Sequence, residues 1–199
     1  MARTQSENYP EIRREILRKA AALFARKGYP NTTIADLAEA NGMSRGLLYH
    51  YFDSKEAMLF EMLTTHLDDM LATIEAAATV GDSAEDRFRN MVRAMVSMNA
   101  ESKDLQIVLL HDLQNLQAAQ RDEIVTKQRA ILAVLRRLIR DNDTVGRTSG
   151  RKLKAYTMMV VGMINYTYIW YDPDGPVGPR AYADMVCGTC LVDLRGQRP

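Results

Sequence analysis

The chain has 199 residues, of which 47% are hydrophobic, with a net charge of +1 and two cysteines. This length suits one large domain or two small ones, and the near-neutral charge excludes a uniformly basic nucleic-acid coat. Because the sequence has neither an apolar run of the ~18 residues that a membrane span needs nor a secretory signal, we expect a cytoplasmic protein without a membrane partner or a disulfide framework.

A first helix is predicted from about residue 9 to residue 27. Its apolar residues recur at helical spacing, and Gly28 followed by Tyr29-Pro30-Asn31 is typical of a helix end and a turn. Residues 1–55 hold nine Lys and Arg residues against six Asp and Glu residues, a net charge of +3. A basic N-terminal segment on a mildly acidic remainder is consistent with nucleic-acid binding at one end of the molecule.

The stretch from residue 32 to residue 55 is typical of a helix-turn-helix followed by the start of a third helix. Thr32 or Thr33 can cap the first of these helices, because a hydroxyl can accept a bond from a free amide of the first turn. Asn41-Gly42 is expected to end that helix, since glycine tolerates the left-handed conformation that a sharp turn requires. Ser44 can then cap the second helix.

Polar and aromatic side chains of the second helix are predicted to face away from the core. Arg45 can bond base edges or phosphates, Tyr49 and His50 suit phosphate or base contacts, and Gly46 lets the backbone approach a duplex closely. Lys55 lies in the first turn of the next helix, where the macrodipole disfavours a cation, so we expect it to meet a phosphate. The candidate DNA-binding residues are Thr33, Ser44, Arg45, Gly46, Tyr49, His50 and Lys55.

The run TTIADLAEANGMSRGLLYHYFDSKEAM, residues 32–58, resembles the DNA-binding domain of the TetR family of bacterial transcriptional regulators. The shared signature lies within roughly the first 60 residues. It comprises Phe24, Gly28, Thr33, Ile34, Ala38, Gly42, Ser44, Gly46, Leu48, Tyr49, Phe52, Lys55 and Glu56. The resemblance implies an all-α fold with a three-helix DNA-binding head, and a regulatory domain of about six helices that dimerises through its last two.

Apolar periodicity predicts six further helices, at about residues 54–79, 83–100, 103–114, 118–141, 151–171 and 179–194. Polar or Gly- and Pro-rich breaks separate them, the firmest being residues 172–176. The helix 54–79 would begin in the head and end in the body, which makes it the mechanical link between them. We therefore expect a DNA-binding domain over residues 1–55 and a ligand-binding and dimerisation domain over residues 56–199.

The helical segments 158–171 and 182–194 are apolar around most of their circumference. A helix of this kind must be buried on more than one side, which agrees with the dimer that the resemblance implies. A homodimer also has a functional reason, since two reading helices related by a two-fold axis recognise a pseudo-palindrome in double-stranded DNA.

Twelve methionines are present, and several lie on helices that surround the ligand pocket in the family. Methionine is flexible and often lines adaptable binding surfaces, although each one can equally be core filler. The candidate ligand-binding residues are Met91, Met95, Met98, Met159, Met163, Tyr166 and Trp170. The stretch WYDPDGP also looks similar to family members that sense acyl- or aryl-coenzyme A. Basic residues within 147–154 would then either meet its phosphates or form a solvated loop.

The sequence thus predicts a ligand-responsive transcriptional repressor that binds a pseudo-palindromic operator as a dimer and is released by a largely apolar small molecule. The alternatives are a helical small-molecule-binding protein or enzyme that uses the head as scaffold, and a protein-interaction module. No cofactor, metal site or catalytic set is expected. Cys187 and Cys190 form a CxxC without a nearby histidine, which suits close helix packing better than zinc binding or redox chemistry.

Overall fold

The computed structural model describes residues 8–172 and 175–196, and every regular element in these two ranges is a helix. The all-α prediction is therefore confirmed for the part of the chain that the structure describes. The elements are α1 (Tyr9–Lys27), α2 (Ile34–Ala40), α3 (Arg45–Tyr51), α4 (Lys55–Ala77), α5 (Ala84–Glu101), α6 (Lys103–His111), the short 3-10 helix η1 (Leu113–Asn115), α7 (Ala118–Asn142), α8 (Lys152–Asn165), α9 (Thr167–Trp170) and α10 (Pro179–Leu194).

Two predicted helices differ from the apolar pattern: one ends early, and the other is divided into two. The helix expected over residues 103–114 stops at His111 and is followed by η1. The helix expected over residues 151–171 is divided at Tyr166, where the Thr167 hydroxyl donates to the carbonyl of Ile164 at 2.7 Å. Of the predicted stop at residues 172–176, Pro173 and Asp174 lie outside the described residues.

The head consists of α1, α2 and α3, and its turns follow from the local sequence. Thr33 and Asp36 form a capping box at the start of α2, and the Ser44 hydroxyl accepts the Leu47 amide at 3.1 Å at the start of α3. Between them Gly42 takes a φ of +63°, the left-handed conformation that the turn requires. The predicted helix-turn-helix is thus present as α2, a tight turn and α3.

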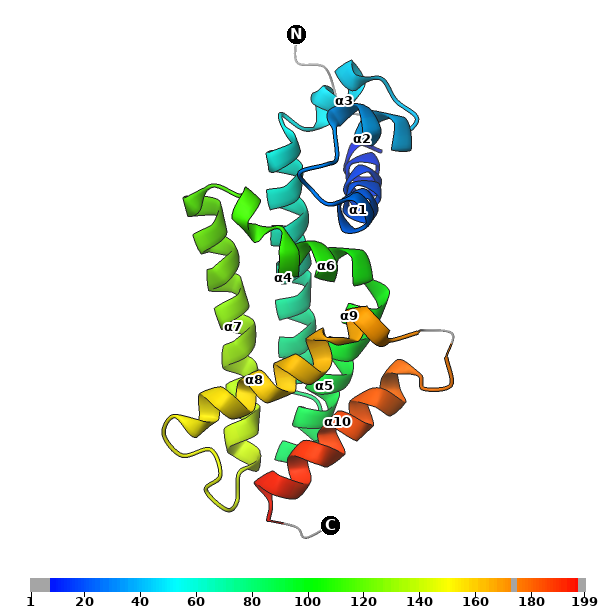
Figure 1. Ribbon diagram of the computed structural model, residues 1–199. Helices are drawn as coiled ribbons and strands as arrows, with labels where there is room; N and C mark the ends of the chain where they lie inside the picture. The colour runs from blue at the N-terminus through cyan, green and yellow to red at the C-terminus, as the bar shows by residue number, and fades with distance from the viewer. Residues whose placement is uncertain (1–7, 173–174, 197–199) are drawn as a thin grey trace.

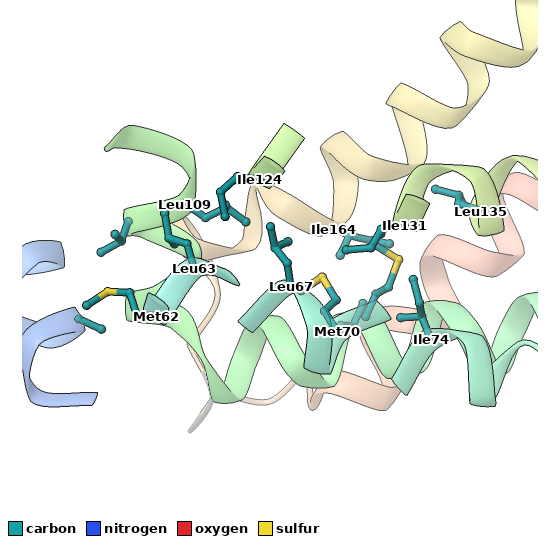
Figure 2. Packing of buried hydrophobic residues seen from close by; sticks show 14 of the residues in the cluster. Met62, Leu63, Leu67, Met70, Ile74, Leu109, Ile124, Ile131, Leu135 and Ile164 are labelled. Carbon is teal, nitrogen blue, oxygen red and sulfur yellow. The ribbon is translucent and has the colours of Figure 1, made fainter. Parts of the chain in front are cut away.

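Helix α4 leaves the head and runs into the body, as Figure 1 shows. It packs against α1 near the head and against α5 and α7 further along. In Figure 2 its Leu63, Leu67, Met70 and Ile74 line up along one side of the helix, close to buried side chains of α6, α7 and α8. Each such buried side chain contributes about 1.5–3 kcal/mol, so α4 is firmly held along the core.

The last two long helices carry apolar residues on both their inner and their outer faces. Val160 and Ile164 of α8 and Val186 of α10 are buried in the core. The outer faces of α8, α9 and α10 expose a second set, which we call the α8–α10 face. It comprises Met158, Met159, Tyr166, Ile169, Trp170 and Met185. The helices that the sequence showed to be apolar all round therefore have one apolar side in the core and another exposed to solvent.

Several features discounted from the sequence have plain structural positions. Cys187 and Cys190 are buried free thiols on α10, and burial raises their pKa values to about 12 and about 11. They are therefore protonated at neutral pH and poorly reactive, in agreement with a packing role.

Within the described ranges there is no cluster of three or more His, Cys, Asp or Glu side chains placed to hold a metal ion. No helix in those ranges is long and apolar enough to cross a membrane.

Candidate nucleic-acid interface and ligand cleft

Helix α3 presents a free polar and aromatic face at the end of the molecule. Arg45 is its first residue and Tyr49 follows one turn later, so the two side chains share a face. Tyr49 is 51% exposed, and Arg45 is exposed and makes no ion pair with any described residue. A Cβ at Gly46 would meet nothing of this chain closer than 3.9 Å, so internal packing does not require glycine there. This face is thus available to a ligand outside the chain.

His50 completes this face from the end of α3. Its ring is exposed and makes edge contacts with Tyr9 and Tyr51, at centroid separations of 6.2 and 5.6 Å. Tyr9 in turn stacks on Tyr51 at 4.9 Å. The aromatic contacts orient the imidazole without using its nitrogens, which leaves them free for a phosphate or a base.

The two hydroxyl residues of the predicted set act as helix caps. The Thr33 hydroxyl both accepts the Asp36 amide at 3.1 Å and donates to the Asp36 carboxylate at 2.7 Å. The Ser44 oxygen accepts the Leu47 amide and keeps its own hydrogen for another acceptor. Both residues are exposed, Thr33 at the start of α2 and Ser44 between the turn and α3, and their bonds position these two helices.

Leu47 is a further exposed side chain of α3, although the sequence analysis did not select it. It is 46% exposed, whereas the adjacent Leu48 is buried. At helical spacing only one of two adjacent leucines can point into the core, and this was the signal available in the sequence. An exposed leucine on a reading helix suits an apolar contact with a thymine methyl group.

Lys55 has an internal position instead of the phosphate-facing one that we expected. Its ammonium donates to the carbonyls of Tyr29 at 2.7 Å and Thr32 at 2.8 Å, and it lies 4.1 Å from the centre of the Tyr29 ring. Partial burial lowers its pKa. Lys55 therefore ties the connection between α1 and α2 to the start of α4. The unfavourable helix position is explained by these carbonyl partners, which no local pattern in the sequence reveals.

Substituting Lys55→Met is expected to destabilise the head while leaving the salt dependence of DNA binding unchanged. Methionine keeps the aliphatic stem but removes the charged donor, at a cost of about 1–2 kcal/mol for a partly exposed group. Urea unfolding followed by circular dichroism measures the loss. Lys152→Met, at an exposed residue of α8, is the matched control. Unaltered stability together with a salt slope reduced by about one unit would instead identify Lys55 as a phosphate contact.

A second unforeseen feature is the position of Arg13 on α1. Its guanidinium forms a two-pronged ion pair with Glu61 of α4, donates to the carbonyl of Tyr51 at the end of α3, and lies 4.1 Å from the centre of the Phe52 ring. These contacts join three helices around one side chain. Arg13 therefore fixes the orientation of α3 relative to α4, and it is unavailable as a DNA contact.

The predicted ligand-binding residues do not gather around one cavity. Met91 and Met95 of α5 are buried in the core, whereas Met159, Tyr166 and Trp170 are exposed on the outer faces of α8 and α9. Met163 is half-buried, and its carbonyl accepts the Tyr182 hydroxyl at 2.6 Å. Met98 is the one member that lines the cleft described next. The methionine pattern showed which helices are amphipathic, but it could not show which face looks into a cavity.

A cleft of about 510 Å³ lies where the head meets the body. Its walls come from α1, from the first half of α4 and from the junction of α5 and α6. The apolar lining comprises Leu17, Ala21, Met62, Met98 and Leu105. The basic residues expected to meet phosphates lie elsewhere, since residues 147–154 belong to the loop between α7 and α8 and the start of α8, at the end of the body away from the head (Figure 1).

His66 is the most deeply buried polar residue of this cleft. Only 5% of it is exposed, and its Nε2 atom is buried without a hydrogen-bond partner among the described residues. An unpartnered buried polar atom costs about 1–3 kcal/mol. Burial lowers the pKa of the imidazole, and the nearby Asp69 carboxylate partly offsets this. His66 is therefore neutral at physiological pH.

The buried imidazole makes stability depend on pH in a defined direction. Because its folded pKa lies below the ordinary value of 6.5, the unfolded chain binds more protons, so stability should fall as pH drops below about 6.5. We expect urea midpoints to decrease from about pH 7 to about pH 5, and to decrease less in His66→Leu. Asp36 and Glu15, whose pKa values are lowered, lose their contribution only below their ordinary values of 3.8 and 4.5. An equal pH dependence in wild type and variant would contradict the assignment.

Two further contacts lie near the head–body junction, and the first of them joins the body to the head. The buried carboxylate of Asp112, just after α6, accepts the backbone amide of Tyr29, and burial raises its pKa. The Glu56 carboxylate accepts the backbone amide of Gln117 at 3.2 Å. The connection between α1 and α2 is thus held by Lys55 from α4 and by Asp112 from the end of α6.

A capped helix-turn-helix with a free reading face, carried on an all-helical body, defines a DNA-binding transcriptional regulator. Comparison with known families agrees. Residues 16–62 match the model for bacterial regulatory proteins of the tetR family, and residues 81–194 match the Tetracyclin repressor-like C-terminal domain. The chain belongs to the TetR family.

Among curated proteins, the chain is 40% identical over 94 residues to the HTH-type transcriptional repressor KstR2 of Rhodococcus jostii strain RHA1. This alignment covers 40% of the chain and 46% of that relative, so the chain spans less than half of its length. Such relatives are transcriptional regulators and not enzymes, in agreement with the sequence analysis.

Solved structures match over far more of the chain. A TetR-family regulator from Bordetella parapertussis 12822 superimposes with a TM-score of 0.84 and 39% identity, covering 90% of this chain and 94% of that one. AibR, solved in complex with isovaleryl coenzyme A and operator DNA, has a TM-score of 0.77 at 24% identity, covering 89% and 97% of the two chains. At that identity the likeness to AibR concerns the fold alone.

Proposed function

We propose that this protein is a ligand-responsive repressor, which binds a pseudo-palindromic operator as a homodimer and is released by a largely apolar small molecule. The single observation that carries the proposal is the unoccupied face of α3, where Arg45 and Tyr49 lie one turn apart with no partner for Arg45 among the described residues. A helical scaffold protein has no need of an exposed arginine and tyrosine at that position.

The proposed reading surface consists of Arg45, Gly46, Tyr49 and His50, with Thr33 and Ser44 at its edge. In this assignment Arg45 addresses base edges or phosphates, and Tyr49 and His50 supply further phosphate or base contacts. Lys55 is omitted because two carbonyls hold its ammonium. We assign residues 1–55 to the DNA-binding domain and residues 56–199 to the regulatory domain, a boundary that coincides with the first residue of α4.

The α8–α10 face supports the homodimer. Its six large apolar side chains are exposed on neighbouring elements near the C-terminal end of the chain, and monomeric proteins rarely leave such a patch uncovered. A second copy, applied about a two-fold axis, would cover the patch with the same residues. The two α3 helices would then be presented to successive major grooves of one duplex.

The effector class rests on the apolar character of the cleft at the head–body junction. Ligand would bind the state released from DNA more tightly than the DNA-bound state, since otherwise it shifts no equilibrium. The acyl or aryl part of a coenzyme A thioester would satisfy the apolar requirement, in keeping with the resemblance of WYDPDGP to thioester-sensing regulators. The basic segment 147–154 adds no support, because it lies away from this cleft.

The proposal is tested by selecting bound sequences from a random duplex pool with the purified protein at near-physiological salt. We expect enrichment of an inverted repeat whose half-sites lie about one helical turn apart. Weak, sequence-independent binding at low salt only would favour the alternative, a helical small-molecule-binding protein or enzyme that uses the head as scaffold.

A further inference from the structure

The cleft at the head–body junction has the size and the lining of a small-molecule site. Its volume of about 510 Å³ lies within the roughly 300–1,000 Å³ that such sites occupy. Leu17 of α1, Met62 of α4 and Met98 of α5 supply an apolar floor from three different helices. The cleft therefore offers apolar burial between elements that belong to the head and elements that belong to the body.

His66 is the one buried polar side chain among the residues that line the cleft. His66 lines the cleft with 5% of its surface exposed, and its Nε2 has no partner among the described residues. This nitrogen is closed to solvent in the free protein, so a ligand in the cleft would reach it through a rotation of the ring, and the bond would relieve an unfavourable unpartnered atom. A neutral imidazole can donate a hydrogen bond to a carbonyl or hydroxyl oxygen, or accept one from a hydroxyl group. It therefore suits a ligand with one such uncharged group.

The charges around the cleft are balanced. Arg14, Arg18 and Lys103 stand against Asp69, Glu101 and Asp104. Of the basic residues, Arg18 is further neutralised by a two-pronged bond to Glu15 at 2.7 Å. With Arg18 paired in this way, the remaining rim residues carry two positive and three negative charges. The rim therefore lacks the positive excess that would attract a polyphosphate such as coenzyme A, and it favours an uncharged ligand.

The cleft lies at the contact through which the head is held. Helix α1 of the head packs directly on α6, and the same two helices form part of the cleft walls. Helix α6 has nine residues, about 13 Å, and just beyond its far end Asp112 accepts the Tyr29 amide. A molecule seated between α1 and α6 therefore acts on an element that touches the head at both ends.

We propose that this cleft is the effector site, and that its ligand is an uncharged molecule with an apolar body and one hydroxyl or carbonyl group bonded to His66. Occupancy separates α1 from α6 and thereby moves the head relative to the body. The effector role rests on the proposed ligand-responsive function, whereas the binding site itself rests on the cleft and on His66.

The test uses Nile red, an uncharged apolar dye with a carbonyl group, titrated into the full-length protein by fluorescence. We expect saturable binding that Thr65→Trp abolishes, because this exposed α4 residue lines the cleft and can close it without disturbing the core. Thr73→Trp, an exposed threonine of the same helix that does not line the cleft, is the matched control and should bind normally.

A second pair of variants tests the polar contact. His66→Leu should weaken Nile red binding about tenfold while raising the melting temperature of the free protein, because it removes an unpartnered nitrogen. His66→Gln retains a polar group and should bind more tightly than His66→Leu. A variant that loses binding together with thermal stability would mark a folding defect, and the Thr65→Trp result then decides.

The outcomes separate the site from the function. Equal dye binding by wild type, Thr65→Trp and Thr73→Trp, or no saturable binding at all, would overturn the cleft proposal even if an inverted repeat is selected. Displacement of the dye by a short-chain acyl-coenzyme A, but not by a methyl ketone with the same chain, would overturn the proposal that the ligand is uncharged.

Binding in the cleft that leaves the affinity for the selected repeat unchanged would overturn the effector role alone. Failure to select any repeat would instead remove the proposed function.

Discussion

Replacing Met159 and Met185 together by glutamate is expected to yield a folded monomer that binds the operator about a thousandfold more weakly. Met159 on α8 is 60% exposed and Met185 on α10 is 62% exposed, so neither supports the core. In a two-fold dimer each substitution occurs twice, which places four carboxylates in an apolar interface where charge is costly to desolvate. The monomer retains one half-site contact and loses the gain from linking two, about 10²–10⁴ in affinity.

Sedimentation velocity gives the oligomeric state, and fluorescence anisotropy with the selected inverted repeat gives the affinity. The control is Val80→Glu, which introduces one glutamate at an exposed apolar residue between α4 and α5. It should leave both quantities unchanged. A Met159→Glu/Met185→Glu protein that remains a dimer with normal operator affinity would show that another face holds the two copies together.

Local sequence determined most of the head. Thr33 with Asp36, Gly42 and Ser44 specify two caps and one turn through bonds that span three residues or fewer, and the structure forms each of them. The apolar periodicity also located the long helices to within a few residues, because packing on one core requires the same spacing along each helix.

The contacts that the sequence did not indicate join residues that are far apart in the chain. Lys55 bonds carbonyls 26 and 23 residues earlier, and Arg13 pairs with Glu61, 48 residues later. Neither pairing produces a periodic pattern in the sequence. The sequence therefore led us to infer an exposed role for Lys55, and it indicated no specific contact for Arg13. The methionine pattern is equally silent about long-range contacts. Helical spacing places Met91 and Met159 on apolar faces, but it cannot distinguish a face in the core from one on the surface.

The cleft could not be predicted from any local stretch. Leu17, His66 and Met98 come from three helices separated by more than thirty residues along the chain, and they meet because α4 packs against both α1 and α5. The sequence also does not show whether His66 has a hydrogen-bond partner. Its Nε2 is buried without one among the described residues, which depends on the surrounding atoms and not on local sequence.

Substituting Arg45→Ala is expected to lower affinity for the selected repeat by about 1–3 kcal/mol per half-site and to relax the base preference at one position of each half-site. Arg45 is the first residue of α3, is exposed, and has no ion pair within the described chain, so its removal should not alter stability. Arginine binds guanine in two places at once, and alanine offers neither bond. The sequence that the variant selects should therefore lose information at that position while keeping the repeat and its spacing.

The comparison variant is Arg151→Ala, an equally exposed arginine just before α8 at the other end of the molecule, which should keep both affinity and preference. Measuring affinity across a range of salt concentrations distinguishes the two roles open to Arg45. A base contact changes the preference, whereas a phosphate contact weakens binding to all sequences equally and reduces the salt slope by about one unit. If the preference is unchanged and only the slope falls, base recognition would have to come from Leu47, Tyr49 or His50, the other exposed side chains of α3.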